Sequence, residues 1–349
     1  MAAVPTDRVD ATPEVVTFGE IMLRLATPGH LRFAQAPHLV MTFGGGEANV
    51  AVSLANYGMP ASFVTRLPAN DIADRCIAEL RGLGVETRHI LRGGERMGIY
   101  FLESGAGPRA SKVIYDRAGA AVAQMKAGDV DWPAVFRGAK WFHWTGITPA
   151  LGDGPAAAVR EACEAAKAAG LTVSTDLNYR KKLWSREKAG EVMGGLMQYV
   201  DVCIANEEDA ESVFNIKGAH VESGKIEREV YADVARQLHE RFGFKQVAIT
   251  LRESISASRN GWSAMLFADG RPHFARRYEI EIVDRVGGGD SFAAGLIYAL
   301  RKGMDTQHAI DWATAASALK HTIPGDFNRA SVAEVDQLAA GDASGRVQR

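Results

Sequence analysis

The sequence predicts an α/β fold in which helices flank a doubly wound, mostly parallel β-sheet. Short apolar runs recur along the chain and alternate with segments of helical period, which is the pattern of βαβ units. The 349 residues are 47% hydrophobic and 23% charged, a composition that can bury a large core. In such sheets ligands bind beyond the carboxyl ends of the strands, so functional residues are expected there.

The elements follow in order along the chain. A first strand is predicted at 15–20, and a first helix at 48–57, which Gly58 ends. The alanine-rich run 156–169 predicts a helix, because Pro155 stands near its start and Gly170 just past its end. Further buried strands are predicted at 141–144, 171–176, 202–205 and 246–251.

Two stretches, 23–42 and 97–117, interrupt the α/β pattern. The second contains two extended runs joined by Ser-Gly-Ala-Gly-Pro, which is hairpin chemistry. We expect both stretches to pair into a small β-sheet lid inserted in one α/β domain that spans 14–335. Residues 1–13 and 340–349 are expected to be flexible ends.

Composition excludes several classes of function. The formal net charge is −2 and the basic residues are scattered, so no basic stripe for a nucleic-acid partner is present. No apolar run is long enough to span a membrane, and the first residues lack the apolar segment of a signal peptide. The three cysteines, Cys76, Cys163 and Cys203, are widely spaced and predict buried thiols in a reducing cytoplasm.

A glycine cluster carries the strongest functional signal. Gly287, Gly288 and Gly289 precede Asp290 and a stretch of helical period in which Phe292, Leu296 and Leu300 recur. Without Cβ atoms, the backbone amides of such a turn can close on an anion at a helix N-terminus. A carboxylate beside this anion cradle suits a base that activates a nucleophile for attack on phosphorus, which indicates phosphoryl transfer.

A structural interpretation stays open beside the functional one. The three glycines could form a flexible loop in which Asp290 merely caps the next helix, because Asp is a favoured N-cap residue.

A second cluster, Gly44, Gly45 and Gly46, opens the first helix, and Asn49 follows one turn later. An amide side chain offers a donor and an acceptor, so Asn49 suits the hydroxyls of a sugar. The alternative is a tight turn with a solvated Asn49.

Together the two segments resemble the signature regions of the ribokinase-like, or phosphofructokinase-B, family of carbohydrate kinases, whose second signature reads approximately D-T-x-G-A-G-D. The likeness covers nearly the whole chain. It implies a ribokinase-like fold, ATP as donor, Asp290 as the catalytic base on the sugar hydroxyl, and an anion hole built from Gly287, Gly288 and Gly289. It also places Gly45, Gly46 and Asn49 at the sugar.

The chain departs from that signature at Arg285, where Thr is usual, and at Gly288, where Ala is usual. In several family members Asp284 and its neighbours form a site for a monovalent cation. The resemblance therefore makes Asp284 a candidate K⁺ ligand, although the charge of Arg285 would compete with that ion.

Two more segments resemble family motifs. Residues 205–211 resemble the N-x-x-E segment, in which Asn206 and Asp209 would order Mg²⁺ through water, Asp209 standing where Glu is usual. An acidic first helical turn is the alternative for Glu207, Glu208 and Glu211.

Thr250, Arg252 and Glu253 stand where the family has a T-L-G-like nucleotide turn. Asn206 and these three residues are the predicted nucleotide contacts, and a surface ion pair of Arg252 with Glu253 is the alternative. The dipeptide Asn260-Gly261 predicts a tight hairpin turn.

The acceptor side holds two arginines, Arg117 on the expected lid and Arg180 after a strand end. A neutral sugar gives no reason for guanidinium groups there, whereas a carboxylate binds an Arg fork bidentately. With Tyr100 and Tyr115, these segments resemble the 2-keto-3-deoxygluconate kinase branch of the family. By that likeness all four residues bind the keto-acid end, and the alternative is that both arginines are surface residues.

We therefore expect an ATP- and Mg²⁺-dependent kinase that phosphorylates the terminal C6 hydroxyl of 2-keto-3-deoxygluconate. A neutral-sugar kinase and a noncatalytic sugar-sensing protein on the same scaffold are the alternatives. An exposed lid edge favours a homodimer or a larger homo-oligomer.

Overall fold

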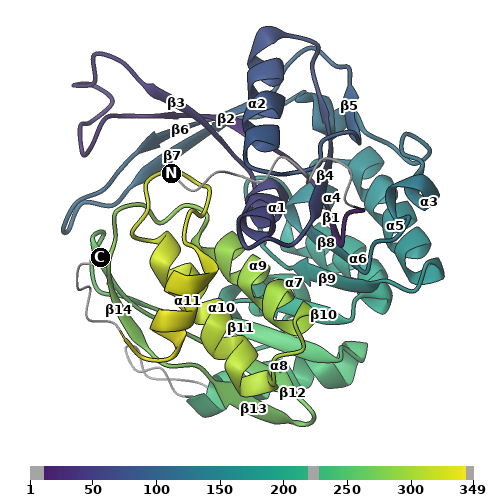
Figure 1. Ribbon diagram of the computed structural model, residues 1–349, viewed down its shortest axis with the longest axis vertical. Coiled ribbons are helices and arrows are strands. Elements are labelled where there is room, and N and C mark those ends of the chain that lie inside the picture. The colour runs from purple at the N-terminus through teal and green to yellow at the C-terminus, as the bar shows by residue number, and fades with distance from the viewer. Residues whose placement is uncertain (1–11, 219–227, 343–349) are drawn as a thin grey trace.

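A computed structural model describes residues 12–218 and 228–342 of the chain. The predicted flexible ends fall largely outside these residues. Two sheets organise the molecule, a ten-stranded sheet in the body and a four-stranded sheet that projects from it, at the upper left of Figure 1.

The strands are β1 (Val15–Phe18), β2 (Met22–Ala26), β3 (Val40–Gly44), β4 (Ala61–Leu67), β5 (Ile90–Arg92), β6 (Gly98–Glu103), β7 (Lys112–Asp116), β8 (Trp141–Thr145), β9 (Thr172–Asp176), β10 (Val202–Ala205), β11 (Gln246–Ser254), β12 (Arg259–Ala268), β13 (Arg271–Phe274) and β14 (Tyr278–Glu281). The helices are α1 (Gly46–Asn56), α2 (Asp71–Gly82), α3 (Trp132–Val135), α4 (Ile147–Ala150), α5 (Asp153–Ala168), α6 (Arg186–Leu196), α7 (Glu207–Phe214), α8 (Arg228–Phe242), α9 (Gly288–Arg301), α10 (Thr306–Lys320) and α11 (Val332–Ala339).

The body sheet has the order β13-β12-β11-β10-β9-β8-β1-β4-β5, with β14 beside β12. Pairing is parallel from β11 to β5 and antiparallel at β12, β13 and β14. The predicted doubly wound, mostly parallel sheet is thus confirmed.

Successive strand residues point to opposite faces, so each face of the body sheet has its own core. Val15 belongs to a core that includes residues of α1, α2, α9, α10 and α11, whereas its neighbour Val16 belongs to a second core that includes residues of α3, α5, α6, α7 and α8. Both faces are covered, which explains why the residues of β1, β8 and β10 are buried without alternation. Cys76, Cys163 and Cys203 are buried free thiols, as the sequence predicts.

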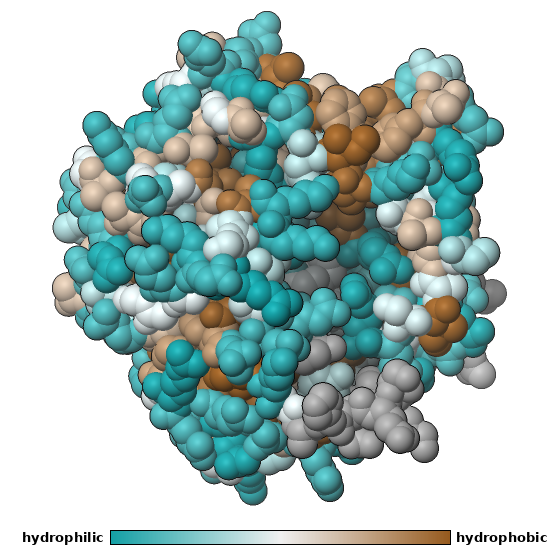
Figure 2. All heavy atoms as spheres, turned by 180° about the vertical axis from the view of Figure 1, so that it is seen from behind, coloured by the Kyte–Doolittle hydropathy of each residue, from teal (hydrophilic) through white to brown (hydrophobic). Residues whose placement is uncertain are grey.

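The stretches 23–42 and 97–117 form the projecting sheet, called the lid sheet below, with the order β3-β2-β6-β7. A small separate cluster of Met22, Ala26, Tyr100 and Leu102 forms part of its packing. Seen from behind, the lid sheet and the body enclose a hollow with hydrophobic residues along its upper rim (Figure 2).

One local prediction is wrong. Asn260 and Gly261 do not form a turn but lie within β12, paired with Ser254 and Glu253, and the chain reverses between these strands at 255–258. Neither residue has a positive φ.

Within residues 12–218 and 228–342, no helix has the length and apolar character needed to cross a membrane.

Candidate active site

A cavity of about 490 Å³ lies between the lid sheet and the carboxyl ends of β9, β10 and β11. It is lined by nearly all of the residues that the sequence singles out: Gly45, Gly46, Asn49, Tyr100, Tyr115, Arg117, Arg180, Asn206, Asp209, Thr250, Arg252, Gly287, Gly288, Gly289 and Asp290. Two of the predicted residues, Asp284 and Glu253, are not among its lining residues. Segments more than 200 positions apart in the sequence therefore share one cavity.

The late glycine cluster forms the N-terminus of α9. Gly287 is the N-cap residue, with φ of 82° in the left-handed region that favours glycine. A Cβ on Gly287 would lie 2.1 Å from the carbonyl oxygen of Asp326, and one on Gly288 would lie 2.5 Å from the His321 ring. Gly289 instead faces open space. The turn thus needs glycine at positions 287 and 288, and all three glycines line the cavity.

Asp290 does not cap α9. It lies in the first turn of the helix, and its Oδ2 accepts a hydrogen bond of 2.7 Å from the Asn49 amide nitrogen. Burial raises the pKa of Asp290 from 3.8 to about 6, while the Asn49 hydrogen bond opposes the shift. A carboxylate with a pKa in this range is a suitable general base near neutral pH.

Asn49 links the two glycine clusters. Its Oδ1 accepts the Gly45 amide at 3.2 Å while its nitrogen donates to Asp290. A Cβ on Gly45 would lie 2.0 Å from the Glu20 carbonyl oxygen, so glycine allows this close approach to the chain between β1 and β2. Asn49 therefore orients the Asp290 carboxylate, a contact that no local motif indicates.

Glu47 lies in the first turn of α1 and ties this turn to neighbouring elements through hydrogen bonds. It is fully buried, and its Oε1 accepts hydrogen bonds from the Thr145 amide, the Thr145 hydroxyl and the Thr148 hydroxyl at 2.7–3.0 Å. Burial raises the pKa of Glu47 to about 7, against the effect of these bonds. This carboxyl group joins α1 to the carboxyl end of β8.

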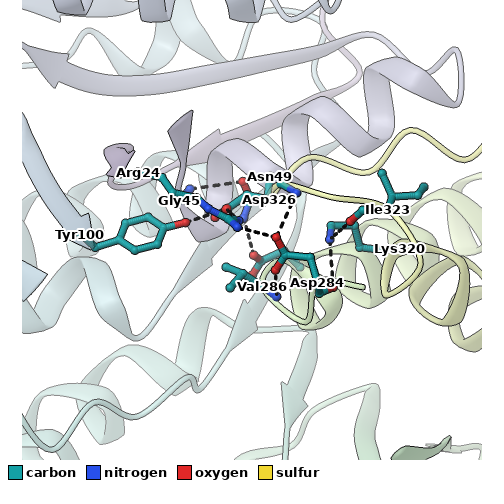
Figure 3. A network of polar contacts seen from close by, with 11 residues as sticks. Arg24, Gly45, Asn49, Tyr100, Asp284, Val286, Lys320, Ile323 and Asp326 are labelled. Atoms are coloured by element: carbon teal, nitrogen blue, oxygen red, sulfur yellow. Dashed lines mark hydrogen bonds and ion pairs between the residues drawn. The ribbon is translucent and has the colours of Figure 1, made fainter. Parts of the chain in front are cut away.

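A charged network connects the lid sheet to the body (Figure 3). Arg24 of β2 is buried and donates to Asp284 at 2.5 Å and to Asp326 at 2.6 Å. The Tyr100 hydroxyl of β6 also donates to Asp326, at 2.6 Å. Two strands of the lid sheet are therefore anchored to carboxylates that flank the cradle residues of α9.

The family resemblance implies Mg²⁺, and the residues near β9 and β10 fit a hydrated ion. Asn206 caps α7 by accepting the Asp209 amide at 2.7 Å, and Asp209 accepts the Tyr179 amide at 3.1 Å. Burial, followed by the fields of Asp209 and Asp290, raises the pKa of Asp176 well above its ordinary value, which is what a nearby cation would relieve. In the described part of the chain no three His, Cys, Asp or Glu side chains group as metal ligands.

Tyrosine and arginine side chains line the part of the cavity that is predicted to hold the acceptor. Tyr100 and Tyr115 lie 6.1 Å apart between ring centroids, and the Arg117 guanidinium lies 4.3 Å from the Tyr115 ring. Arg117 forms an ion pair with buried Glu20 at 3.1 Å. Arg180 is exposed and donates to the Tyr179 carbonyl at 3.2 Å, and no salt bridge of Arg180 is found among the described residues.

Of the predicted nucleotide contacts, Asn206, Thr250 and Arg252 line the cavity. Glu253 instead pairs with Arg277 at 2.5 Å, away from Arg252. The signature departure Arg285 donates to the carbonyls of Ser256 and Ala257 at 3.4 and 3.1 Å.

Five buried or cavity residues have no role that local sequence motifs indicate: Arg24, Glu47, Asp176, Lys320 and Asp326. Arg24 has one sequence signal, because it is a charged residue within the otherwise apolar strand Met-Leu-Arg-Leu-Ala. Asp326 follows a Pro-Gly pair near the end of the last long helix. The buried positions of Glu47 and Lys320 have no sequence signature of their own.

Comparison with known proteins gives the same classification. A model of the pfkB family of carbohydrate kinases matches residues 12–330. A 2-dehydro-3-deoxygalactonokinase of Haloferax volcanii is 33% identical over 334 residues, which cover 96% of this chain and 99% of that protein. A 2-dehydro-3-deoxygluconokinase of Thermoproteus tenax is 28% identical over 323 residues, 91% of each chain.

The crystal structure of a 2-dehydro-3-deoxygluconokinase from Thermotoga maritima matches with a TM-score of 0.91 and 52% identity, covering 94% of this chain and 100% of that chain. The family model spans most of the chain, and both glycine clusters and Asp290 converge on one cavity. This chain belongs to the pfkB family of carbohydrate kinases.

Proposed function

We propose that this kinase transfers the γ-phosphoryl group of ATP to the terminal C6 hydroxyl of 2-keto-3-deoxygluconate. The observation that carries the substrate class is the presence of Arg117 and Arg180 in the cavity that contains Asp290. They come from different elements, the end of β7 and the turn after β9. The names of the relatives point to the same class of sugar acids.

The two arginines differ in how much charge they offer a substrate. Glu20 and the Tyr115 ring already contact Arg117, so this residue forms a fixed wall. Arg180 is exposed at the cavity and close enough to Asp290 to affect its pKa. Arg180 is therefore the main partner of the substrate carboxylate, through a charge-assisted bond worth about 1.5–3 kcal/mol.

The reaction then follows from the positions of the side chains. The Asp290 carboxylate accepts the proton of the C6 hydroxyl while that oxygen attacks the γ-phosphorus, and ADP leaves. Asn49 holds the carboxylate in the orientation to accept this proton. The amides of residues 287–290 stabilise the charge that develops on the phosphoryl oxygens. Mg²⁺, ordered by Asn206 and Asp209, would neutralise charge on the phosphates.

We place this activity in the cytoplasm, where ATP is available and the three buried thiols stay reduced. A homodimer or larger homo-oligomer formed through the lid sheet is part of the same proposal. Size-exclusion chromatography with light scattering tests the assembly.

The function is tested by direct measurement of ADP release over a panel of acceptors. The panel contains 2-keto-3-deoxygluconate, its C4 epimer 2-keto-3-deoxygalactonate, gluconate, fructose and ribose, and ³¹P–¹H NMR locates the phosphorylated carbon. We expect fast turnover with a keto-deoxy sugar acid and a product phosphorylated at C6. Faster turnover with fructose or ribose would support the neutral-sugar kinase, and binding without ADP release would support the sugar sensor.

Arg180→Ala separates the acceptor classes. Loss of the carboxylate bond is expected to raise KM for the sugar acid about 10- to 100-fold, with little change for a neutral sugar. Lys181→Ala is the matched control, because Lys181 is an exposed neighbour that does not line the cavity. Equal effects of Arg180→Ala on both acceptor classes would contradict a carboxylate-binding role.

A further inference from the structure

Lys320 is a fully buried lysine beneath the anion cradle. It is the last residue of α10 and has 0% exposure. Its Nζ donates to the Ile323 carbonyl at 3.1 Å and lies 3.4 Å from the Asp284 carbonyl (Figure 3). A Cβ on Gly287 would lie 3.3 Å from Lys320 Cε, so the side chain packs against the turn that begins α9.

The charge of Lys320 has several carboxylates around it. Burial lowers the pKa of Lys320, while the fields of Asp284, Asp326 and Asp290 oppose that shift. Arg24, on the other side, pairs with Asp284 and Asp326. Two cations of the chain itself therefore balance the acidic residues next to the cradle, since an uncompensated buried carboxylate would be costly.

The oxygen atoms of Asp284 show why an added cation does not fit here. Its Oδ2 accepts from Arg24 at 2.5 Å and from the Gly325 amide at 3.0 Å, and its Oδ1 accepts from the Val286 amide at 3.1 Å. Its carbonyl oxygen faces the Lys320 ammonium. Every oxygen that Asp284 could offer to K⁺ thus already faces a donor of the protein, and two of these donors are positively charged.

We propose that the Lys320 ammonium takes the place of a bound monovalent cation, holding the 284–287 turn so that the amides of α9 point at the transferred phosphoryl group. Lys320 is then a positioning residue, because it acts through the turn and not on the substrate. The consequence for the proposed phosphoryl transfer, on which this inference rests, is that turnover does not require K⁺. The Asp284 site of this chain would differ from that of K⁺-dependent relatives.

The unmodified enzyme provides the first test. Turnover is measured at saturating Mg²⁺-ATP and sugar acid in KCl, NaCl or tetramethylammonium chloride at one ionic strength. ADP is quantified by chromatography, because coupling enzymes can have cation requirements of their own. We expect kcat to agree within about twofold across the three salts, a margin below about 0.5 kcal/mol. A severalfold rise of kcat that saturates with K⁺ overturns the proposal.

The second test removes the ammonium. Lys320→Ala leaves a space lined by the Asp284 and Ile323 carbonyls, and we expect kcat to fall 10- to 100-fold and to recover severalfold with K⁺ or methylammonium. Tetramethylammonium, which is too large and has no donor, should not restore it. Lys320→Met fills the space without a charge, so its low kcat should respond to no cation. Lys126→Ala is the control, an exposed lysine that does not line the cavity.

The outcomes separate a cation from a structural tether. Lys320→Ala activity that is low and indifferent to K⁺ and to methylammonium reduces Lys320 to a packing role and overturns the proposal, as does a Lys320→Met variant with normal kcat. If Lys320→Ala does not fold, the salt series of the unmodified enzyme and the activity of Lys320→Met still test whether Lys320 replaces a cation.

Thermal unfolding distinguishes this inference from the function itself. If no acceptor is phosphorylated in any salt, the proposed function fails, whereas the cation question is still answered without turnover. The midpoint temperature of thermal unfolding of the Lys320→Ala variant should then be higher in K⁺ than in Na⁺, because a ligand that binds only the folded state stabilises it. The unmodified protein should show no K⁺-specific shift, and a shift of equal size in both proteins overturns the inference.

Discussion

Asp290 has its raised pKa because of where it lies, in a cavity wall that removes most of the water around its carboxylate. The Asn49 hydrogen bond and the more distant charges of Arg180 and Lys320 oppose this shift, so the pKa reaches about 6 and no higher. A base must be deprotonated before it can accept the substrate proton. In the proposed mechanism the acidity of Asp290 therefore sets the lower limit of the pH range in which the enzyme turns over.

The corresponding prediction concerns the pH profile. As pH falls through about 6, kcat/KM should decrease tenfold per unit, because the protonated fraction of Asp290 increases. Asp290→Asn should lower kcat by at least about 10³-fold while KM for the sugar acid changes little, since Asn cannot accept the proton. Steady-state kinetics from pH 5 to 8 check both statements, and near-normal kcat in Asp290→Asn would show that another group is the base.

The same shift has a consequence for stability, with a definite sign. A carboxyl group whose pKa is higher in the folded state binds its proton more tightly there, so its burial destabilises the protein increasingly as pH rises through the folded pKa. Asp290→Asn should therefore raise the free energy of unfolding at pH 8, by up to about 3 kcal/mol.

Urea unfolding of both proteins at pH 8 and pH 4 measures this difference. The stability gain should shrink between pH 6 and pH 4, because wild-type Asp290 becomes neutral in that interval. A variant that is less stable than the wild type at pH 8 would mean that the Asn49 contact is lost with the charge.

At the scale of elements, α9 is positioned by close backbone contact. Its N-cap Gly287 has a left-handed φ of 82° and lies under the carbonyl of Asp326, while Gly289, two residues later, faces open space. The three consecutive glycines of the sequence therefore have different functions. Gly287 and Gly288 permit close packing, and Gly289 leaves room in front of the helix.

Alanine substitutions test this division. Gly287→Ala should lower the free energy of unfolding by about 2–3 kcal/mol, from the left-handed φ and the 2.1 Å approach to the Asp326 oxygen, and should nearly abolish turnover. Gly289→Ala is the matched control and should change stability by less than about 1 kcal/mol. Chemical unfolding and ADP release measure the two effects, and equal destabilisation by the two substitutions would rule out the packing role of Gly287.

The helices and strands also show which features local sequence patterns can predict. The buried strands, the helices and the two lid stretches could be predicted because each has a local signal, such as an apolar run or a helical period. The supposed turn at Asn260-Gly261 failed because β11 and β12 extend past the apolar run, and cross-strand pairing outweighs the turn preference of two residues. Asn49 was found as a site residue, but its contact with Asp290 could not be predicted, because it spans 241 positions.

At the scale of the whole molecule, charges hold the lid sheet to the body. Arg24 reaches Asp284 and Asp326 across 260 and 302 positions, a pairing that no local pattern in the sequence indicates. Each partner is a buried charge that would be costly alone. The acceptor end of the cavity therefore depends on contacts that form only when the two sheets are together.

This arrangement predicts unequal protection of the two sheets. One face of the central lid strands β2 and β6 has a cluster of only a few buried residues, and the other face meets a single core through Leu23, Leu25 and Ile99. In contrast, β1 and β8 are interior strands of the body sheet and lie between two extensive cores. Backbone amides of β2 and β6 should exchange with deuterium at least about tenfold faster than those of β1 and β8, since lower local stability allows more frequent opening.

Sugar acid should then slow exchange in β6 and β7, which carry Tyr100 and Tyr115 at the cavity, and should leave β1 and β8 unchanged. Hydrogen–deuterium exchange with mass spectrometry, with and without 2-keto-3-deoxygluconate, makes both comparisons, and fructose at the same concentration is the control acceptor. Equal protection of the two sheets without ligand would mean that the Arg24 pairs join them into one cooperative unit. Slowing by fructose as strong as that by the sugar acid would remove the lid tyrosines from the recognition of the acid.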